Sequence, residues 1–209
     1  KQQLFQEDIR ELTNIQGLGQ LEILATLIQH QTGELTSYSS LAKKTRVSVD
    51  TIRRWTGTLE SLYFCFAVRP WTKNITRSLL KEPKYYLWDW SQCTSKGGRN
   101  ENFIASHLLK AVHNWTDQGL GEYELFFLRD KDKREVDFLV SKNQQPWFIV
   151  EVKSSIKEKL SPNLALFQKQ LSLKHAFQVA MDGDYIDRDI FTLDKLTIVP
   201  AKTFLSQLV

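Results

Sequence analysis

The sequence predicts a mixed α/β (α+β) protein built in two parts, residues 1–95 and 96–209. In the first part, stretches with apolar residues at three- and four-residue steps precede two strand-like stretches. In the second part a helical stretch, three strands, a helix and another strand follow in the order α-β-β-β-α-β. Because 42% of the 209 residues are hydrophobic, the chain can bury a core of ordinary size.

The first helix is expected over residues 20–31, where four apolar side chains share one stripe before Gly33: Leu21, Leu24, Leu27 and Ile28. Ser37 is suited to cap a short helix over residues 38–45, and Ser48 a longer one over residues 49–62. A tight turn is expected between them. Two helices in this order and of these lengths are typical of a helix-turn-helix.

Strands are expected next, at residues 63–69 and 84–88, and two strands behind a helix-turn-helix make a winged helix. Residues 36–84 hold ten Lys or Arg against three Asp or Glu, an excess of seven positive charges that predicts a polyanionic partner. We expect DNA to contact the basic side chains of this part: Lys43, Lys44, Arg46, Arg53, Arg54, Lys73, Arg77 and Lys81. The alternative is a winged helix that only packs against neighbouring domains, with its basic face solvated.

The polar stretch 91–98, which ends in two glycines, is the expected boundary between the two parts. Asn100 is suited to cap a helix over residues 101–115, with Glu101 in its first turn. Strands are expected at residues 123–129, 135–141 and 146–153, then a helix over 162–173 and a strand at 175–181. A last strand at residues 195–200 and a short helix close the chain.

The hairpin of residues 135–141 and 146–153 carries charge where a buried strand usually has apolar residues. If its turn is centred on Gln144, Asp137 lies opposite Glu151, and directly opposed residues share a face of the sheet. Lys153, two residues beyond Glu151, shares that face as well. Two carboxylates this close repel each other unless a cation joins them, and ligation by oxygen alone suits Mg²⁺ or Mn²⁺.

Each of these side chains then has a chemical role. Asp137 and Glu151 would hold the metal ion, which would activate water and polarise a phosphodiester. Lys153 would orient the water or neutralise charge that develops on the phosphate, and Glu101 would complete the metal's ligands. The alternatives are structural: an acid favoured by its helix dipole for Glu101, an ion pair at a strand end for Glu151 with Lys153, and a solvated hairpin residue for Asp137.

The spacing of Asp137, Glu151 and Lys153, with Glu101 on a helix upstream, resembles the PD-(D/E)XK nuclease superfamily, whose restriction-endonuclease-like core has the order αβββαβ. Longer stretches resemble, in this order, the C-terminal region of prokaryotic AAA-type ATPases of the archaeal-ATPase-like group: RRWTGTLESLYFCFAVRPW, NITRSLLKEPKYYLWD, ENFIASHLLK, LFFLRDKDKREVDFLV and FIVEVKSS. That region is a winged helix followed by a nuclease-like domain of unknown function. The likeness covers nearly the whole chain.

The resemblance implies that an ATPase domain precedes Lys1 in the intact protein, with residues 4–12 as the linker. It also implies that the site is formed by Glu101, Asp137, Glu151 and Lys153. The chain itself has no G-x-x-x-x-G-K-[ST] loop, so no ATP site of that kind is expected within it. Two departures stand out: Val136 replaces the proline that usually precedes the aspartate, and Trp90 replaces the glycine that usually follows Asp89.

Three functions stay open: a metal-dependent DNA nuclease or nuclease-like DNA-processing module, a non-catalytic module that binds DNA or a partner beside the ATPase, and a scaffold for assembly, with or without oligomer formation. The intact acids and lysine favour the first over the third. Cys65 and Cys93 fit neither a disulfide framework nor a zinc pattern and indicate a reducing cytoplasm. No apolar stretch approaches the length of a membrane span, so no membrane contact is expected.

Overall fold

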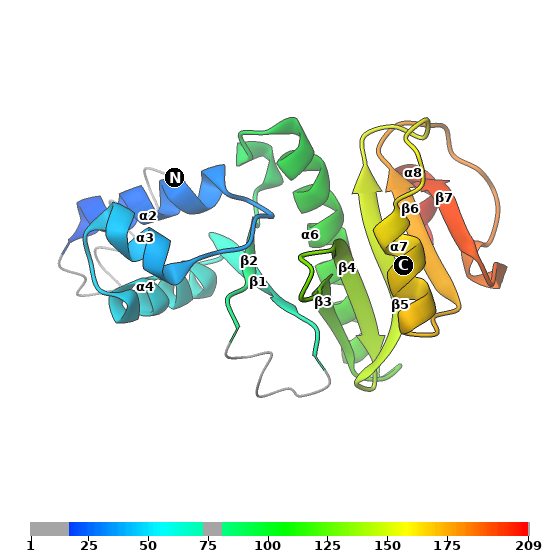
Figure 1. The fold of residues 1–209 in the computed structure, drawn as a ribbon, viewed down its shortest axis with the longest axis horizontal. Coiled ribbons are helices and arrows are strands. Elements are labelled where there is room, and N and C mark those ends of the chain that lie inside the picture. Colours follow the sequence, from blue (N-terminus) through cyan, green and yellow to red (C-terminus); the bar gives the residue numbers. More distant parts are fainter. Residues whose placement is uncertain (1–16, 73–80, 209) are drawn as a thin grey trace.

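The computed structural model describes residues 17–72 and 81–208. Within these residues the chain forms six α-helices and one mixed sheet of seven strands (Figure 1). The order of the strands across the sheet is β2-β1-β3-β4-β5-β6-β7. The two strands of the first part of the chain therefore continue the sheet of the second part. Among the described residues, no helix is both long and apolar enough to cross a membrane.

Three helices open the described chain and lie together at one end of the molecule in Figure 1: α2 (Leu18–His30), α3 (Tyr38–Thr45) and α4 (Val49–Ser61). The two predicted caps are confirmed. Ser37 Oγ accepts the backbone N–H of Ser40 at 3.3 Å, and Ser48 Oγ accepts that of Thr51 at 3.1 Å. The apolar stripes of these helices pack into one cluster, as their spacing predicts.

Strands β1 (Cys65–Pro70) and β2 (Lys84–Leu87) form an antiparallel pair, and all four residues of β2 are buried. Alternation along β2 explains this, because successive side chains point to opposite sides. Tyr85 and Leu87 pack against the three helices, whereas Tyr86 joins the larger core of the second part. β1 is joined to β3 (Tyr123–Arg129) by two parallel residue pairs.

The next helix begins earlier than the sequence predicts. α6 spans Lys96–Asp117 and is capped by Ser95, not by Asn100. Ser95 Oγ accepts the backbone N–H of Gly98 at 3.0 Å, and a Cβ on Gly98 would lie 2.8 Å from that oxygen. It would also lie 3.3 Å from the carbonyl oxygen of Thr32. Gly98, which the sequence predicts in a linker, instead lies in the first turn of α6 and allows the Thr32 carbonyl to approach the helix closely. The short 3₁₀ helix η2 (Trp90–Gln92) precedes it.

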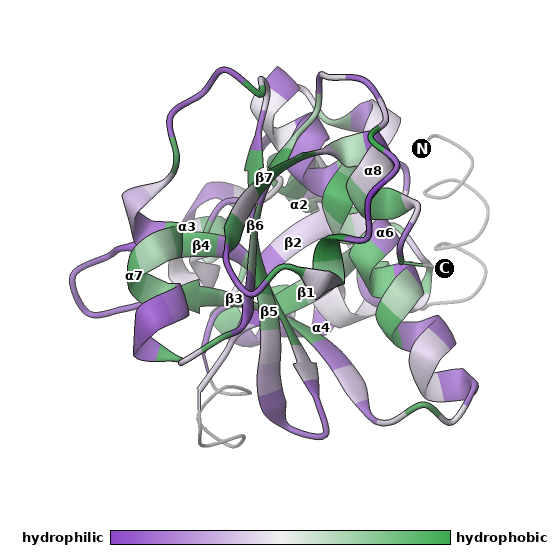
Figure 2. Ribbon diagram, turned by 90° about the vertical axis from the view of Figure 1, so that its right-hand side faces the viewer, coloured by the Kyte–Doolittle hydropathy of each residue, from purple (hydrophilic) through white to green (hydrophobic). Residues whose placement is uncertain are grey.

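The remaining elements follow the predicted order: β4 (Glu135–Lys142), β5 (Gln145–Lys153), α7 (Pro162–Gln170), β6 (His175–Ala180), the 3₁₀ helix η3 (Ile190–Thr192), β7 (Leu196–Pro200) and α8 (Ala201–Leu205). β3, β4 and β5 are antiparallel, and β5, β6 and β7 are parallel. Helices α6 and α8 cover one face of the sheet and α7 the other. Hydrophobic residues, green in Figure 2, gather in the sheet and on the helices beside it, while the connecting loops are mostly hydrophilic.

The β4–β5 hairpin turns at Asn143 and Gln144, which both have positive φ, as tight hairpin turns require. Next to the turn Ser141 pairs with Pro146, but one step further Val140 pairs with Phe148. Trp147 is therefore the extra residue of a bulge. The bulge restores the register that a turn centred on Gln144 would give, in which Phe138 pairs with Val150. Asp137 and Glu151 are the next positions along the two strands.

Asn102 fastens α6 to the sheet edge at β2. Its side chain is fully buried, its Nδ2 donates to the carbonyl oxygen of Leu87 at 2.8 Å, and its Oδ1 accepts the Leu87 N–H at 2.7 Å. The Asn102 amide thus satisfies the backbone N–H and C=O of Leu87, as a neighbouring strand would. We expect Asn102→Ala to lower the free energy of unfolding by about 3 kcal/mol, because two buried backbone groups lose their partners.

Urea unfolding of Asn102→Ala beside Asn100→Ala tests this role. The Asn100 amide donates to the hydroxyl of the exposed Ser154, at 3.2 Å, so its loss should change the free energy of unfolding by less than about 0.5 kcal/mol. Equal losses in the two variants would show that Asn102 does not secure β2.

Candidate functional site

Four acids from three elements come together with two lysines. The acids, called the acid cluster below, are Glu101 of α6, Glu135 and Asp137 of β4, and Glu151 of β5. The lysines are Lys84 of β2 and Lys153 of β5. The site therefore joins the first part of the chain to the second.

The hairpin side of the cluster contains the residues predicted to hold a metal. Asp137 Oδ2 accepts the backbone N–H of Val152 at 2.8 Å, where the pairing of β4 with β5 ends. Lys153 Nζ lies 2.8 Å from Glu151 Oε1. The other oxygen, Glu151 Oε2, is buried and has no hydrogen-bond partner among the described residues. A carboxylate oxygen in that position lacks the compensation that burial normally requires.

The opposite side of the cluster is organised by β2. Lys84 Nζ lies 2.5 Å from Glu135 Oε1 and 3.4 Å from Glu101 Oε1, and its side chain is only 3% exposed. Two residues further along the strand, and so on the same side of it, the Tyr86 hydroxyl donates to Glu101 Oε1 at 2.6 Å. Arg129 contacts the second oxygen of Glu135, at 2.5 Å. Glu101 and Glu135 thus have partners within the protein.

Asp137 interacts with residues of both sides of the cluster, and its pKa reflects both. Burial raises the pKa of Asp137 well above its usual range, and the carboxylates of Glu101 and Glu151 raise it further. Lys84 and the Val152 N–H act in the opposite direction. The neighbouring carboxylates therefore disfavour ionisation of Asp137, and a bound cation would relieve this repulsion.

Both lysines stay charged. Burial lowers the pKa of Lys84, but the negative charges of Glu101, Asp137 and Glu135 outweigh it, and the pKa of Lys84 is raised overall. Burial likewise opposes the charge of Lys153, and its hydrogen bond to Glu151 together with the charge of that residue raises the pKa. The cluster thus carries two permanent cations of its own.

Glu101 differs from the other predicted ligands, although it reaches the same cluster. Its Oε1 is already bonded to Tyr86 and ion-paired with Lys84. In the described part of the chain, no three His, Cys, Asp or Glu side chains lie close enough together to hold a metal ion between them. That Asp137 and Glu151 hold a cation stays a prediction.

Sequence reasoning missed Lys84, Tyr86 and Glu135 as members of the site. In the sequence, Lys84 contributes only to the basic excess of the first part, and the stretch KYYL predicts a wing strand. The available signal was a lysine at the head of an otherwise apolar strand, in alternation with Tyr86.

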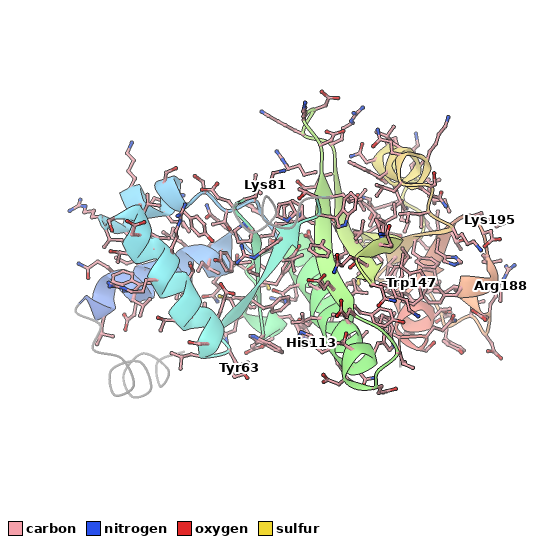
Figure 3. All side chains as sticks on the ribbon, turned by 90° about the horizontal axis from the view of Figure 1, so that it is seen from below. Tyr63, Lys81, His113, Trp147, Arg188 and Lys195 are labelled. Atoms are coloured by element: carbon pink, nitrogen blue, oxygen red, sulfur yellow. The ribbon has the colours of Figure 1, made fainter. Side chains whose placement is uncertain are left out.

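The predicted DNA-binding residues that the structure describes are all exposed on the first part of the chain: Lys43, Lys44, Arg46, Arg53, Arg54 and Lys81. None of them forms an ion pair with another described residue. Arg53 lies over the ring of Tyr38, 5.6 Å from its centre. Lys73 and Arg77 lie outside the described residues. Figure 3 shows Lys81 on this part of the molecule, with Arg188 and Lys195 at the far end.

Two protein-family models match the chain. Residues 2–99 match DUF8612 and residues 96–203 match DUF4143, each described as a domain of unknown function. The chain belongs to the DUF4143 family, and DUF4143 domains are commonly found at the C-terminus of AAA-type ATPases. Searches of curated proteins and of solved structures gave no match. The family descriptions state no activity. The features that bear on function are the acid cluster and the basic surface, which consists of Lys43, Lys44, Arg46, Arg53, Arg54 and Lys81.

Proposed function

We propose that this chain is the DNA-processing part of an AAA-type ATPase, in which a winged helix binds DNA and a PD-(D/E)XK-like domain cleaves it with Mg²⁺ or Mn²⁺. The observation that carries the proposal is the buried, unpartnered Oε2 of Glu151, two residues from Lys153 and close to Asp137. The element order αβββαβ around this site supports it as well.

Asp137 and Glu151 would hold the ion. Asp137 would contribute the oxygen that does not accept the Val152 N–H, and Glu151 the one that does not contact Lys153. Carboxylate oxygens are the ligands that Mg²⁺ and Mn²⁺ prefer. Such an ion supplies a Lewis acid at the phosphate and a strong nucleophile at neutral pH.

Lys153 would act on the substrate directly. Its side chain is 28% exposed, so its ammonium is accessible from solvent while Glu151 fixes it at 2.8 Å. A charge held in this way can donate to a phosphate oxygen or to the attacking water without first having to be ordered. The raised pKa of Lys153 keeps it protonated, which suits charge stabilisation rather than service as a general base.

The exposed basic side chains of α3 and α4 would hold the DNA. Arg53 and Arg54 project from α4, the second helix of the helix-turn-helix, and Lys43, Lys44 and Arg46 flank the turn before it. In a winged helix this second helix enters the major groove, and flanking lysines contact phosphates. The excess of seven positive charges over residues 36–84 supports this assignment.

A second candidate, a non-catalytic binding module, is favoured by a different observation. Lys84 is already ion-paired with Glu101 and Glu135, and Arg129 with Glu135, without any added ion. In that case the acid cluster would be a structural joint between the two parts of the chain, and only the basic surface would be functional.

Cleavage assays separate the two candidates. Wild type, Lys153→Met and the exposed control Lys157→Met are incubated with supercoiled, linear duplex and single-stranded DNA, with Mg²⁺, with Mn²⁺ or with chelator. The nuclease proposal predicts metal-dependent cleavage that falls by about a hundredfold or more in Lys153→Met and stays unchanged in Lys157→Met. DNA binding by wild type without cleavage in either metal would instead establish the non-catalytic module.

A further inference from the structure

Lys84 occupies an unusual position for a lysine. It lies at the start of the edge strand β2, yet its ammonium is buried against Glu135, Glu101 and the ring of Phe127, whose centre is 5.4 Å away. Such burial keeps Lys84 from any substrate in this conformation. Its charge therefore acts on its neighbours, among them Glu101, Glu135 and Asp137 of the acid cluster.

The position of Lys84 bears directly on metal binding. Lys84 lowers the pKa of Asp137, whereas Glu101 and Glu151 raise it. The Lys84 ammonium therefore already offsets part of the repulsion that these two carboxylates exert on Asp137. A divalent ion bound to Asp137 and Glu151 would meet that ammonium as a like charge in a partly desolvated site. In addition, Lys84 and Tyr86 both engage Glu101 Oε1, so this carboxylate already has partners of its own.

We propose that Lys84 is a built-in counter-ion that competes with a divalent ion for the acid cluster and thereby sets the metal affinity of the site. The inference rests on the proposed function in so far as that assigns the ion to Asp137 and Glu151. Unlike a free ion, Lys84 cannot diffuse away, because β2 is fixed by its pairing with β1 and by the Asn102 side chain. The strand that carries Lys84 belongs to the part with the basic surface, so control of metal affinity lies in the part proposed to bind DNA.

Mn²⁺ binding to four forms of the whole chain tests the proposal: wild type, Lys84→Met, Lys84→Arg and Lys110→Met. Methionine keeps most of the length and volume of the side chain but removes its charge. We expect the Mn²⁺ dissociation constant, measured from the electron paramagnetic resonance signal of free Mn²⁺, to fall by about tenfold or more in Lys84→Met. Lys84→Arg, which keeps the charge, and Lys110→Met, on an exposed position of α6, should stay within about twofold of wild type.

Thermal unfolding gives a second readout that does not depend on DNA. Without metal, Lys84→Met should unfold at a lower temperature than wild type, since three partly buried acids lose a nearby cation, and Mn²⁺ should raise its melting temperature more than that of wild type. A folded Lys84→Met with unchanged or weaker Mn²⁺ binding would overturn the proposal. If Lys84→Met does not fold, Lys84→Met/Glu135→Gln is compared with Glu135→Gln alone, and the same tighter binding is expected.

The two proposals fail in different ways. Tighter Mn²⁺ binding by Lys84→Met without cleavage by any form supports the counter-ion and removes the nuclease. Metal-dependent cleavage by wild type with equal Mn²⁺ affinity in both forms supports the nuclease and removes the counter-ion.

Discussion

Replacing Asp137 with asparagine should abolish metal-dependent DNA cleavage, lowering its rate by about a thousandfold or more. The amide carries no charge with which to hold a divalent ion next to Glu151. Its Oδ1 can still accept the Val152 N–H that Asp137 Oδ2 accepts at 2.8 Å, so the end of the hairpin should keep its geometry. Single-turnover cleavage of a labelled duplex in Mn²⁺ measures the change. Asp132→Asn, in the exposed loop before β4, is the matched control and should cleave like wild type.

The same substitution should stabilise the protein in the absence of metal. Because the pKa of Asp137 is raised on folding, its protonated form favours the folded state, fully so below about pH 4. As the pH rises through the raised folded-state pKa, that contribution is lost from wild type, whereas asparagine has no proton to lose. The free energy of unfolding of Asp137→Asn relative to wild type should therefore increase between pH 5 and pH 8.

Urea unfolding at these two pH values, with chelator present, checks the sign. A variant that loses activity and stability together would point to a structural role for Asp137. If the variant loses activity while its stability rises, Asp137 serves function rather than stability, because its like-charged neighbours oppose folding.

Reversing the charges of Arg53 and Arg54 should weaken DNA binding by about a hundredfold at 0.15 M salt. Both side chains are exposed on α4, and each phosphate contact that is lost also removes the release of one counter-ion. The slope of log affinity against log salt concentration should therefore decrease in magnitude by about two for Arg53→Glu/Arg54→Glu. Fluorescence anisotropy with a labelled duplex at several salt concentrations gives both values.

The control reverses two exposed charges at the far end of the molecule, in Arg188→Glu/Lys195→Glu (Figure 3). This variant has the same net charge as the Arg53→Glu/Arg54→Glu variant but leaves the basic surface intact. Equal losses of affinity in the two variants would mean that DNA responds only to net charge, and α4 would lose its assigned role.

Much of the fold could be predicted because the signals are local. Serines at positions 37 and 48 cap their helices through bonds to residues three positions along the chain. Alternation along residues 146–153 and a short polar turn sufficed to place Asp137 near Glu151, although a bulge at Trp147, which the sequence did not reveal, supplies the register. Apolar periodicity located the helices, but α7 ends at Gln170 rather than at residue 173, since Ser172 has a φ of 52°.

The features that were missed depend on contacts between distant parts of the chain. The Thr32 carbonyl of the first part lies so close to Gly98 of α6 that a side chain there would crowd it. Nothing in the stretch 91–98 signals that neighbour. Lys84 is buried because β2 lies between the helices α2–α4 and the core of the second part. Its partners Glu101 and Glu135 are 17 and 51 positions along the chain. Local periodicity contains no information about such pairings.

The most direct test of the central claim is Mn²⁺-dependent cleavage of supercoiled plasmid by Glu151→Gln, measured beside Glu124→Gln, an exposed acid on β3. The unpartnered oxygen of Glu151 is the observation on which the nuclease assignment depends. The assignment predicts no cleavage above the metal-free background for Glu151→Gln and the wild-type rate for Glu124→Gln. Cleavage at the wild-type rate by Glu151→Gln would contradict it.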